Sequence, residues 1–457
     1  MHQSKPPRIA KYRNRRSVSS ADKMADMIDE QEHDGCHVVG KPNESPLNGV
    51  TRDFVKAHRG ENVRDLALKT KHTEQLDLPT ALDQIAGWQI ASKKLPQWAQ
   101  SDDIVYPPHI SMEQCSSQFT AQYKNEIARR LCTAHSQEGA QSKTTSMVDL
   151  TGGFGVDFSY LADGFDQATY VERQPRLCEL AAHNMAALEI RQARIMCGDG
   201  VGYLHDMEPV DLIYIDPARR DEHGSRTYAI EDCSPNVLDL RDPLLGKAEF
   251  TMIKLSPMLD WRKAVADFEG AVTEVHIVST GNECKELLLV LGDGRARSDG
   301  TMRAPHVYCV NDGQRIDYDS AAYTQGLRVG GALLPEMTYL YEPNASIMKA
   351  GCFDLIEERY GVKQIGPSSH LFVSDRPVED FPGRGFMIEG IGGMGKKDIK
   401  RLLGGIRQAN IAVRNFPLTA TQLRKKLGMA DGGNVYLFGT TMQGGDHILL
   451  CTAKIDR

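Results

Sequence analysis

Residues 147–155 run Met-Val-Asp-Leu-Thr-Gly-Gly-Phe-Gly, a short apolar segment that leads into a glycine-rich turn. Three more apolar segments follow, at 168–172, 193–197 and 210–215, and helix-like sequence separates them. This alternation is typical of βαβ units with a parallel sheet. In open sheets of this kind, ligands bind outside the carboxyl ends of the strands. We therefore expect the acidic residues that end or follow these strands to face one common crevice. They are Asp149, Glu172, Asp199 and Asp216.

The strand pattern continues beyond the fourth segment. Apolar segments at 250–255, 275–279 and 306–310 bring the predicted strands to seven, so we expect an α/β fold with a Rossmann-like sheet. Before the sheet, the apolar spacing over 51–98 is helical, and Ser111 with Gln114 forms a capping-box pattern for a helix that runs to about residue 131. After the sheet, shorter alternating segments predict small C-terminal α+β domains.

A chain of 457 residues is too long for one compact core, so several domains are expected. Residues 1–50 are polar and nearly free of aromatic side chains, which predicts a disordered tail. The domains predicted after this tail are a helical N-terminal domain (51–138), a Rossmann-like domain (139–325), a small ferredoxin-like α+β domain (326–390) and a basic α+β domain (391–457).

Composition excludes several classes of protein. The longest aliphatic run, at 287–291, is far too short to span a bilayer, so no membrane association is expected. The ten cysteines show no Cys-x-x-Cys pair and no paired Cys/His spacing, so we interpret them as reduced thiols of a cytoplasmic protein without a metal site. The formal net charge is −7, but residues 391–457 carry 11 Lys/Arg and only 4 Asp/Glu. A basic end on an acidic protein indicates a polyanionic partner.

The glycines of the turn allow the backbone to approach a ligand closely. A dinucleotide-binding turn would require a further glycine for helix packing, and Phe158 occupies that position. The pattern of residues 149–155 instead resembles the first motif of class I S-adenosylmethionine methyltransferases. The resemblance implies that Asp149 lies beside the methionine amine, Glu172 holds ribose hydroxyls and Asp199 accepts a hydrogen bond from the adenine amine. The full set of expected cofactor contacts is Asp149, Thr151, Gly152, Gly153, Phe154, Gly155, Glu172, Arg173, Asp199, Gly200 and Asp216.

The fourth predicted strand ends in Asp216-Pro217-Ala218-Arg219-Arg220. This motif resembles the Asp-Pro-x-Arg variant of several RNA methyltransferases, including those that act at pyrimidine C5, more than the Asp/Asn-Pro-Pro-aromatic motif of enzymes that modify exocyclic amines. A covalent C5 mechanism needs a cysteine nucleophile. The turn after the fifth strand is Lys254-Leu255-Ser256-Pro257, so that mechanism is disfavoured unless Cys233 or another thiol substitutes. We expect Asp216 to orient the target atom or accept its proton, with Pro217 and Arg219 beside it.

Basic side chains are the expected substrate contacts. Arg219 and Arg220 either clamp a phosphate or are solvated charges on a surface loop. Lysines on the two predicted helices of the last domain would contribute sequence-independent, salt-sensitive affinity for phosphates, or would simply increase solubility. The complete set of predicted substrate contacts is Arg219, Arg220, Lys254, Lys396, Lys397 and Lys425.

Several motifs together resemble a bacterial family of class I methyltransferases that carry a C-terminal THUMP-like domain. They are Tyr106-Pro107-Pro108-His109, Glu113-Gln114-Cys115-Ser116-Ser117, Thr120-Ala121-Gln122-Tyr123-Lys124, and the segments 149–157, 214–220 and 283–287. The resemblance covers about residue 51 to the end. It implies a seven-stranded class I methyltransferase sheet, S-adenosylmethionine as cofactor and structured RNA as partner. It also implies a helix over 112–131 that folds across the cofactor, where Ser116, Ser117 and Thr120 either line the site or lie on the helix surface.

The leading hypothesis is therefore a methyltransferase that modifies structured RNA, such as tRNA or rRNA, at a base nitrogen or a ribose oxygen. A small-molecule methyltransferase stays open, because nothing in the sequence excludes a metabolite as acceptor. The intact acidic residues at the strand ends argue against a binding protein that has lost catalysis. Phe158 argues against an oxidoreductase that uses a nicotinamide cofactor.

Overall fold

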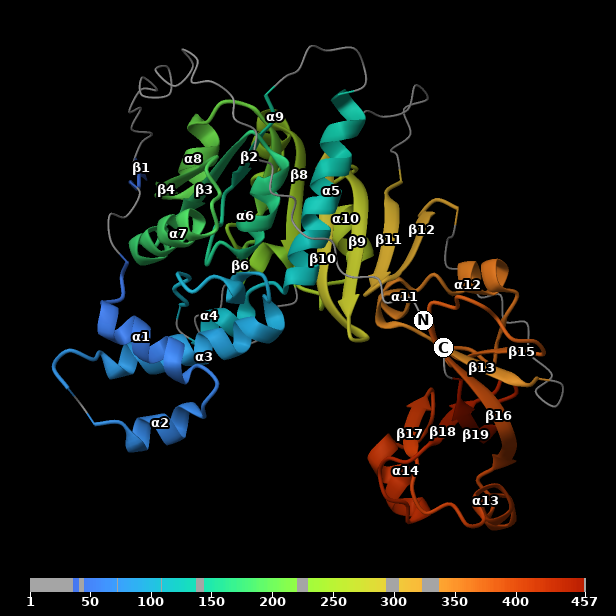
Figure 1. The fold of residues 1–457 in the computed structure, drawn as a ribbon. Coiled ribbons are helices and arrows are strands. Elements are labelled where there is room, and N and C mark those ends of the chain that lie inside the picture. The colour runs from blue at the N-terminus through green and yellow to red at the C-terminus, as the bar shows by residue number, and fades with distance from the viewer. Residues whose placement is uncertain are drawn as a thin grey trace, which may run out of the picture.

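The structure is a computed structural model that describes residues 36–40, 45–71, 73–107, 109–136, 144–219, 229–292, 304–322 and 337–455 (Figure 1). Its helices are α1 (Gly49–His58), α2 (Val63–Lys69), α3 (Leu78–Lys94), α4 (His109–Gln114), α5 (Gln118–Ser136), α6 (Val156–Leu161), α7 (Pro175–Ala187), α8 (Gly200–Asp206), α9 (Arg241–Lys247), α10 (Trp261–Asp267), α11 (Ala345–Ala350), α12 (Phe353–Tyr360), α13 (Lys396–Leu403) and α14 (Ala420–Leu427). Its strands are β1 (His37–Val38), β2 (Ser146–Asp149), β3 (Gln167–Glu172), β4 (Ala193–Cys197), β5 (Val210–Ile215), β6 (Ala218–Arg219), β7 (Cys233–Ser234), β8 (Ala248–Leu255), β9 (Val272–Thr280), β10 (Glu283–Gly292), β11 (His306–Asn311), β12 (Gln314–Asp319), β13 (Tyr339–Pro343), β14 (Lys363–Gln364), β15 (Phe372–Ser374), β16 (Gly383–Gly393), β17 (Asn410–Arg414), β18 (Val435–Thr441) and β19 (His447–Lys454).

The main sheet contains ten strands in the order β1-β4-β3-β2-β5-β8-β10-β9-β11-β12. Strands β4, β3, β2, β5 and β8 run parallel to one another, so their carboxyl ends lie at one edge of the sheet. The seven predicted strands are present as β2, β3, β4, β5, β8, β9 and β11. The predicted α/β, Rossmann-like fold is confirmed.

The sequence pattern did not predict β10. This strand pairs antiparallel with both β8 and β9, and the side chains of Leu287 to Leu291 are fully buried. A strand that is covered on both faces is a continuous apolar run, which periodicity cannot distinguish from a segment of buried helix. The sheet is therefore larger than the seven strands expected, with β10 inside it and β1 and β12 at its edges.

Helices cover both faces of the main sheet (Figure 1). Helices α5, α6 and α7 contribute to one hydrophobic cluster, and α8, α9 and α10 contribute to another. Successive side chains of β5 alternate between the two clusters: Leu212 and Tyr214 belong to the first, Ile213 and Ile215 to the second. Burial on both faces holds the parallel strands in one register and so fixes where their carboxyl ends lie.

Two N-terminal predictions were partly wrong. Residues 36–40, assigned to the disordered tail, lie at the sheet edge, where His37 and Val38 pair with β4. A two-residue strand has too little periodicity to be recognised in sequence. The helix predicted over 112–131 is instead divided, because α4 ends at Gln114 and α5 begins at Gln118. Ser116 lies in the break and is buried, where its hydroxyl contacts buried charged groups.

The C-terminal strands form a second, seven-stranded sheet in the order β14-β15-β13-β16-β19-β18-β17. The long strand β16 crosses the predicted boundary at residue 390 and pairs with β13 on one side and β19 on the other. Tyr341 and Phe381 belong to the cluster under the main sheet, so this part packs directly against the Rossmann-like domain. Leu403 of α13 and Leu423 of α14 share a separate cluster, which places both helices on one face of the second sheet. The division into two C-terminal domains stays a prediction.

Within the part of the chain that the structure describes, no helix is both long enough and apolar enough to cross a bilayer. The same residues contain no group of three or more His, Cys, Asp or Glu side chains placed to hold a metal ion.

Candidate functional site

A cavity of about 1120 Å³ lies at the carboxyl ends of the parallel strands of the main sheet. Its wall combines the glycine turn after β2, the residues that end or follow β3 and β4, and the motif after β5. The predicted site residues that line it are Thr151, Gly153, Phe154, Glu172, Arg173, Asp199, Gly200, Asp216, Pro217 and Lys254. The structure brings these residues together, and their individual roles stay predictions.

The glycine turn is fixed by its backbone conformation and by a close contact with β3. Gly153 and Gly155 have φ of 54° and 85°, a left-handed backbone that favours glycine. A Cβ on Gly152 would lie 2.1 Å from the ring of Tyr170, whose hydroxyl donates a hydrogen bond to the Gly153 carbonyl oxygen at 2.6 Å. The turn is therefore fixed against β3, and α6 begins directly after it.

Two acidic residues at the cavity wall hold backbone N–H groups. The carboxylate of Glu172 accepts hydrogen bonds from Gly153 N (3.0 Å) and Gln174 N (2.9 Å), one on each oxygen. Asp199 caps α8 by accepting a hydrogen bond from Gly202 N at 2.9 Å. Each carboxylate oxygen has two lone pairs, so both side chains keep acceptor capacity for a ligand.

Replacing Gly200 by alanine is expected to weaken ligand binding and to destabilise the fold by about 1–3 kcal/mol, because a Cβ here would lie 2.1 Å from the Leu150 carbonyl oxygen and would push the turn away from α8. Calorimetric titration with S-adenosylhomocysteine and thermal unfolding measure the two effects. Gly202→Ala in the same helix is the matched control, since its Cβ would meet only Asp199 Oδ2 at 3.8 Å. If the two variants had the same ligand affinity and the same unfolding temperature, the close approach of Gly200 to the Leu150 carbonyl would be contradicted.

Asp149 is buried behind the cavity and does not line it. Burial raises the pKa of its carboxyl well above the usual range, and the charges of Asp157, Asp216 and Glu172 act in the same direction. Asp149 Oδ1 accepts a hydrogen bond from Thr151 N at 2.9 Å, and Thr151 Oγ1 accepts one from Asp216 N at 2.6 Å. The geometry thus connects Asp149 to the backbone of the turn, and its contact with the methionine amine stays a prediction. Gly152 and Gly155 likewise shape the turn without lining the cavity.

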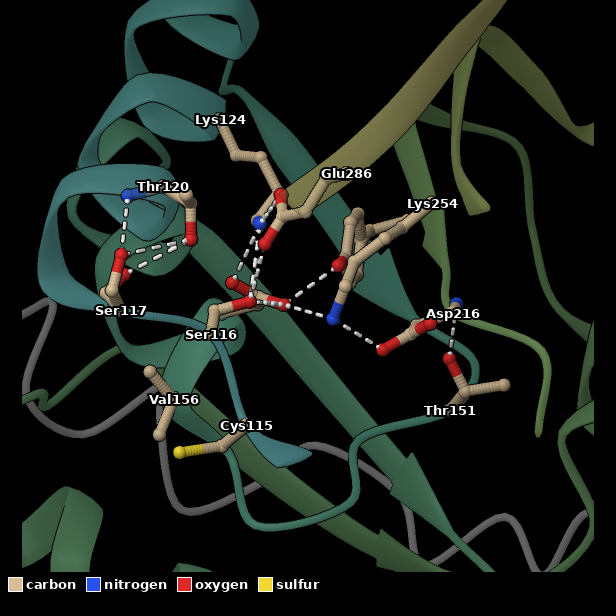
Figure 2. A network of polar contacts seen from close by, with 12 residues as sticks. Cys115, Ser116, Ser117, Thr120, Lys124, Thr151, Val156, Asp216, Lys254 and Glu286 are labelled. Carbon is tan, nitrogen blue, oxygen red and sulfur yellow. Dashed lines mark hydrogen bonds and ion pairs between the residues drawn. The ribbon is translucent and has the colours of Figure 1, made fainter. Parts of the chain in front are cut away.

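Asp216 forms an ion pair with Lys254 at the cavity wall (Figure 2). Lys254 Nζ lies 2.6 Å from Asp216 Oδ2 and 3.4 Å from Asp157 Oδ2. Burial opposes the ammonium form, but the charges of Asp216, Asp157 and Glu286 raise the pKa of Lys254 well above its ordinary value. Burial raises the pKa of Asp216, and Lys254 counteracts this rise. The pair therefore presents an ammonium and a half-buried carboxylate to the cavity.

A buried group of charges lies behind this pair (Figure 2). Lys124 Nζ, which is fully buried, is 2.5 Å from Glu286 Oε2 and 3.1 Å from Asp157 Oδ1. Ser116 Oγ lies 2.9 Å from Asp157 Oδ2 and 3.0 Å from Glu286 Oε1, and Tyr214 OH donates to Asp157 Oδ2 at 2.7 Å. Burial opposes ionisation of Asp157, but Lys124 and Lys254 lower its pKa. The charges compensate one another inside the protein.

Three buried charged residues were not predicted to have a role, although all lie in the motifs that carry the family resemblance: Lys124, Asp157 and Glu286. Their signal was a charged residue inside an apolar element: Glu286 directly precedes five aliphatic residues, and Asp157 is enclosed by Val156 and Phe158. Such residues are buried only when they are paired. Of the three residues proposed to line the cofactor site, Ser116 joins the buried charges, while Ser117 and Thr120 hydrogen-bond each other.

Several predicted contacts lie elsewhere. Lys396, Lys397 and Lys425 are exposed on α13 and α14 and do not line the cavity. Arg220 and the side chain of Arg219 lie outside the described residues. The cavity wall also contains two thiols, Cys115 and Cys233. Burial raises the pKa of Cys115, which disfavours the thiolate that a covalent mechanism would need.

Comparisons with known proteins agree with this architecture. A family model of a ferredoxin-like domain matches residues 339–382, and a model of a THUMP-like domain matches residues 383–454. The crystal structure of a candidate methyltransferase from Porphyromonas gingivalis W83 is 30% identical, with a TM-score of 0.73, and the alignment covers 89% of this chain and 98% of that one. No curated protein matches the chain significantly.

Two further solved structures match smaller parts of the chain. One is a SAM-dependent methyltransferase from Agrobacterium tumefaciens, at 15% identity and a TM-score of 0.27, covering 38% of this chain and 61% of that chain. The other is an rRNA methylase from Streptococcus thermophilus, at 14% identity and a TM-score of 0.27, covering 37% and 94%. Both likenesses are too slight to carry an argument.

Proposed function

We propose that this protein, which belongs to the class I S-adenosylmethionine-dependent methyltransferases with a C-terminal THUMP-like domain, methylates structured RNA such as tRNA or rRNA. The acceptor is a base nitrogen or a ribose oxygen, and no covalent cysteine intermediate forms. The observation that carries the proposal is the single cavity in which the glycine turn, Glu172, Asp199 and Asp216 meet at the carboxyl ends of parallel strands.

The cavity wall suits the three parts of S-adenosylmethionine, which supplies an activated methyl group. Glu172 follows β3 and offers acceptor oxygens to ribose hydroxyls, and Asp199 after β4 offers them to the adenine amine. Gly153 lines the cavity without a side chain and so leaves space for the methionine portion. Asp216 lies beside the turn, where it orients the acceptor and takes its proton. Positioning and charge neutralisation then contribute most of the rate.

The C-terminal sheet supports RNA as the acceptor. Helices α13 and α14 pack on the same face of this sheet, and Lys396, Lys397 and Lys425 on them are exposed. Since residues 391–457 carry 11 Lys/Arg and 4 Asp/Glu, this part of an otherwise acidic protein attracts a polyanion. We propose that these lysines contact RNA phosphates while the cavity holds the acceptor nucleotide.

Replacing Lys396, Lys397 and Lys425 together by glutamine is expected to weaken RNA binding and to make it less sensitive to salt. The slope of log Kobs against log salt concentration is negative, and each lost phosphate contact makes it less negative by roughly 0.7 to 0.9, so loss of three contacts makes it less negative by roughly 2 to 3. Filter binding of total tRNA at several salt concentrations measures the slope. A triple variant with the wild-type slope would rule out this surface.

The proposed activity is tested with RNA from a strain that lacks this protein. Purified protein and S-adenosylmethionine with a labelled methyl group are added, the RNA is digested to nucleosides, and labelled products are identified by mass spectrometry. The proposal is supported if the labelled product is a methylated nucleoside that RNA from the parent strain contains and RNA from the deletion strain lacks. Protein that binds S-adenosylhomocysteine but labels no RNA would overturn RNA as the acceptor and favour a metabolite.

A further inference from the structure

The chemistry of the acceptor subsite depends on a chain of alternating charges that ends at the cavity. Glu286, Lys124, Asp157, Lys254 and Asp216 follow one another, with contacts of 2.5, 3.1, 3.4 and 2.6 Å between successive members. They come from β10, α5, α6, β8 and the residue after β5. Of the five, Lys254 and Asp216 line the cavity. Three carboxylates and two ammonium groups leave one net negative charge next to the cavity, which is the sign that would compensate a bound sulfonium.

Lys254 is a fixed cation at this subsite. Its side chain is 14% exposed, and two carboxylates lie within ion-pair distance of its ammonium. An amine acceptor builds up positive charge on its nitrogen as it attacks the methyl group, and a neighbouring ammonium opposes that charge. A hydroxyl acceptor instead builds up negative charge on its oxygen as its proton leaves, and the ammonium stabilises that charge. The ammonium of Lys254 therefore favours an oxygen over a nitrogen acceptor.

The described part of the cavity wall offers little aromatic surface on which a base could stack. Among the lining residues that the structure describes, Phe154 is the one aromatic side chain, and its ring packs against Trp98 with centroids 5.1 Å apart. It is also 7% exposed, so little of its ring faces the cavity. Recognition of a base lifted out of a stack generally uses aromatic or apolar stacking partners. Among the described lining residues, Phe154 therefore offers little aromatic surface to a base, whereas Lys254 and Asp216 offer polar contacts to a hydroxyl.

We propose that the acceptor is a ribose hydroxyl, and that Lys254 and Asp216 are the two groups of this chain that act on it. This inference rests on the proposed function, since it narrows the acceptor from a base nitrogen or a ribose oxygen to the oxygen. In an internal RNA nucleotide the 3′ and 5′ oxygens are in phosphodiester bonds, so the acceptor is the 2′-hydroxyl.

The step balances as follows in atoms and charge. The hydroxyl proton passes to the Asp216 carboxylate while the oxygen forms a bond to the methyl carbon. The bond between this carbon and the sulfonium breaks, and its electron pair stays on sulfur as a neutral thioether. Lys254 keeps its protons and donates a hydrogen bond to the hydroxyl oxygen. Asp216 afterwards releases the proton to water.

The position of the methyl group in the labelled nucleoside tests the inference directly with the wild-type protein. Nucleosides are fragmented at the glycosidic bond in the mass spectrometer, and the label is expected on the ribose fragment. The methylated linkage is also expected to resist alkaline hydrolysis, because this cleavage needs a free 2′-hydroxyl. Label on the base fragment would overturn the hydroxyl assignment while leaving the proposed function intact. The absence of any labelled nucleoside would overturn both.

Lys254→Met tests the role of the ammonium. We expect kcat for RNA methylation to fall about 10²- to 10³-fold, as for loss of one group that stabilises developing negative charge. Affinity for S-adenosylhomocysteine, measured by calorimetry, is expected to stay within about twofold, which also shows that the variant is folded. Lys263→Met on α10 removes an exposed lysine that does not line the cavity and serves as the control. Unchanged kcat in Lys254→Met would overturn the assignment.

The pH profile separates this role from a structural one. Asp216 is faced by Lys254, Asp157 and Lys124, and by the buried Asp149 through Thr151. Since Lys254 lowers the pKa of Asp216, its removal raises that pKa, and the acidic limb of kcat/KM is expected to move to higher pH. Lys254→Arg keeps the positive charge, so its acidic limb of kcat/KM is expected at the same pH as in the wild-type protein. An acidic limb at the same pH in all three proteins would contradict the pairing of Lys254 with the catalytic carboxylate.

Discussion

Lys124→Met is expected to reduce the free energy of unfolding by about 3–5 kcal/mol, the usual result of removing one partner from a buried ion pair. Lys124 is fully buried, with its ammonium 2.5 Å from Glu286 and 3.1 Å from Asp157. Methionine fills a similar volume but leaves two buried carboxylates with less compensation. Urea denaturation followed by circular dichroism measures the change.

Two comparisons test the reason for this loss. Lys263→Met removes an exposed ammonium that pairs with Asp267 and Glu231, and it is expected to change the free energy of unfolding far less than Lys124→Met does. The double variant Lys124→Met/Glu286→Leu is expected to recover part of the loss, because it removes an uncompensated carboxylate as well. Lys124 also lowers the pKa of Asp157 and so stabilises the folded protein by favouring the carboxylate. This stabilisation is fully present above the ordinary pKa of 3.8 and is lost as the pH falls through the lowered pKa of the folded protein. A Lys124→Met variant as stable as the wild type at pH 7 would contradict the buried network.

Asp216→Asn is expected to lower kcat for methyl transfer about 10²- to 10⁴-fold, the contribution usual for a positioned general base. Asparagine keeps the shape of the side chain, and the backbone hydrogen bond from residue 216 to Thr151 is unaffected. The amide, however, cannot take the proton of the acceptor. Affinity for S-adenosylhomocysteine is expected to stay near the wild-type value, so the loss falls on kcat rather than on cofactor binding. Single-turnover transfer of labelled methyl groups to RNA from the deletion strain measures it.

The control for this variant is Asp206→Asn, which neutralises an exposed carboxylate at the far end of α8. It changes the net charge by the same amount and is expected to leave kcat unchanged. If Asp216→Asn retained full activity, another group would have to accept the proton. If it lost affinity for S-adenosylhomocysteine in proportion to kcat, Asp216 would be a cofactor contact rather than the base.

Much of the fold followed from local sequence. The strands β2, β3, β4 and β5 were predicted from apolar segments that end at acidic residues or glycine, and the turn at 151–155 from its glycines. These features depend on residues that are close in the chain, such as the positive φ of Gly153 and Gly155. Because parallel strands carry their carboxyl ends to one edge, the meeting of Glu172, Asp199 and Asp216 at one cavity followed as well.

The division between α4 and α5, the strand β10 and the buried charges were decided by tertiary structure alone. Helical spacing continues through Ser116, but its hydroxyl reaches Asp157 and Glu286 only because the chain breaks there. The ammonium of Lys124 meets a glutamate 162 residues further along the chain. A charge can be buried only where partners from other elements compensate it, and no local pattern shows which partners the folded chain brings together.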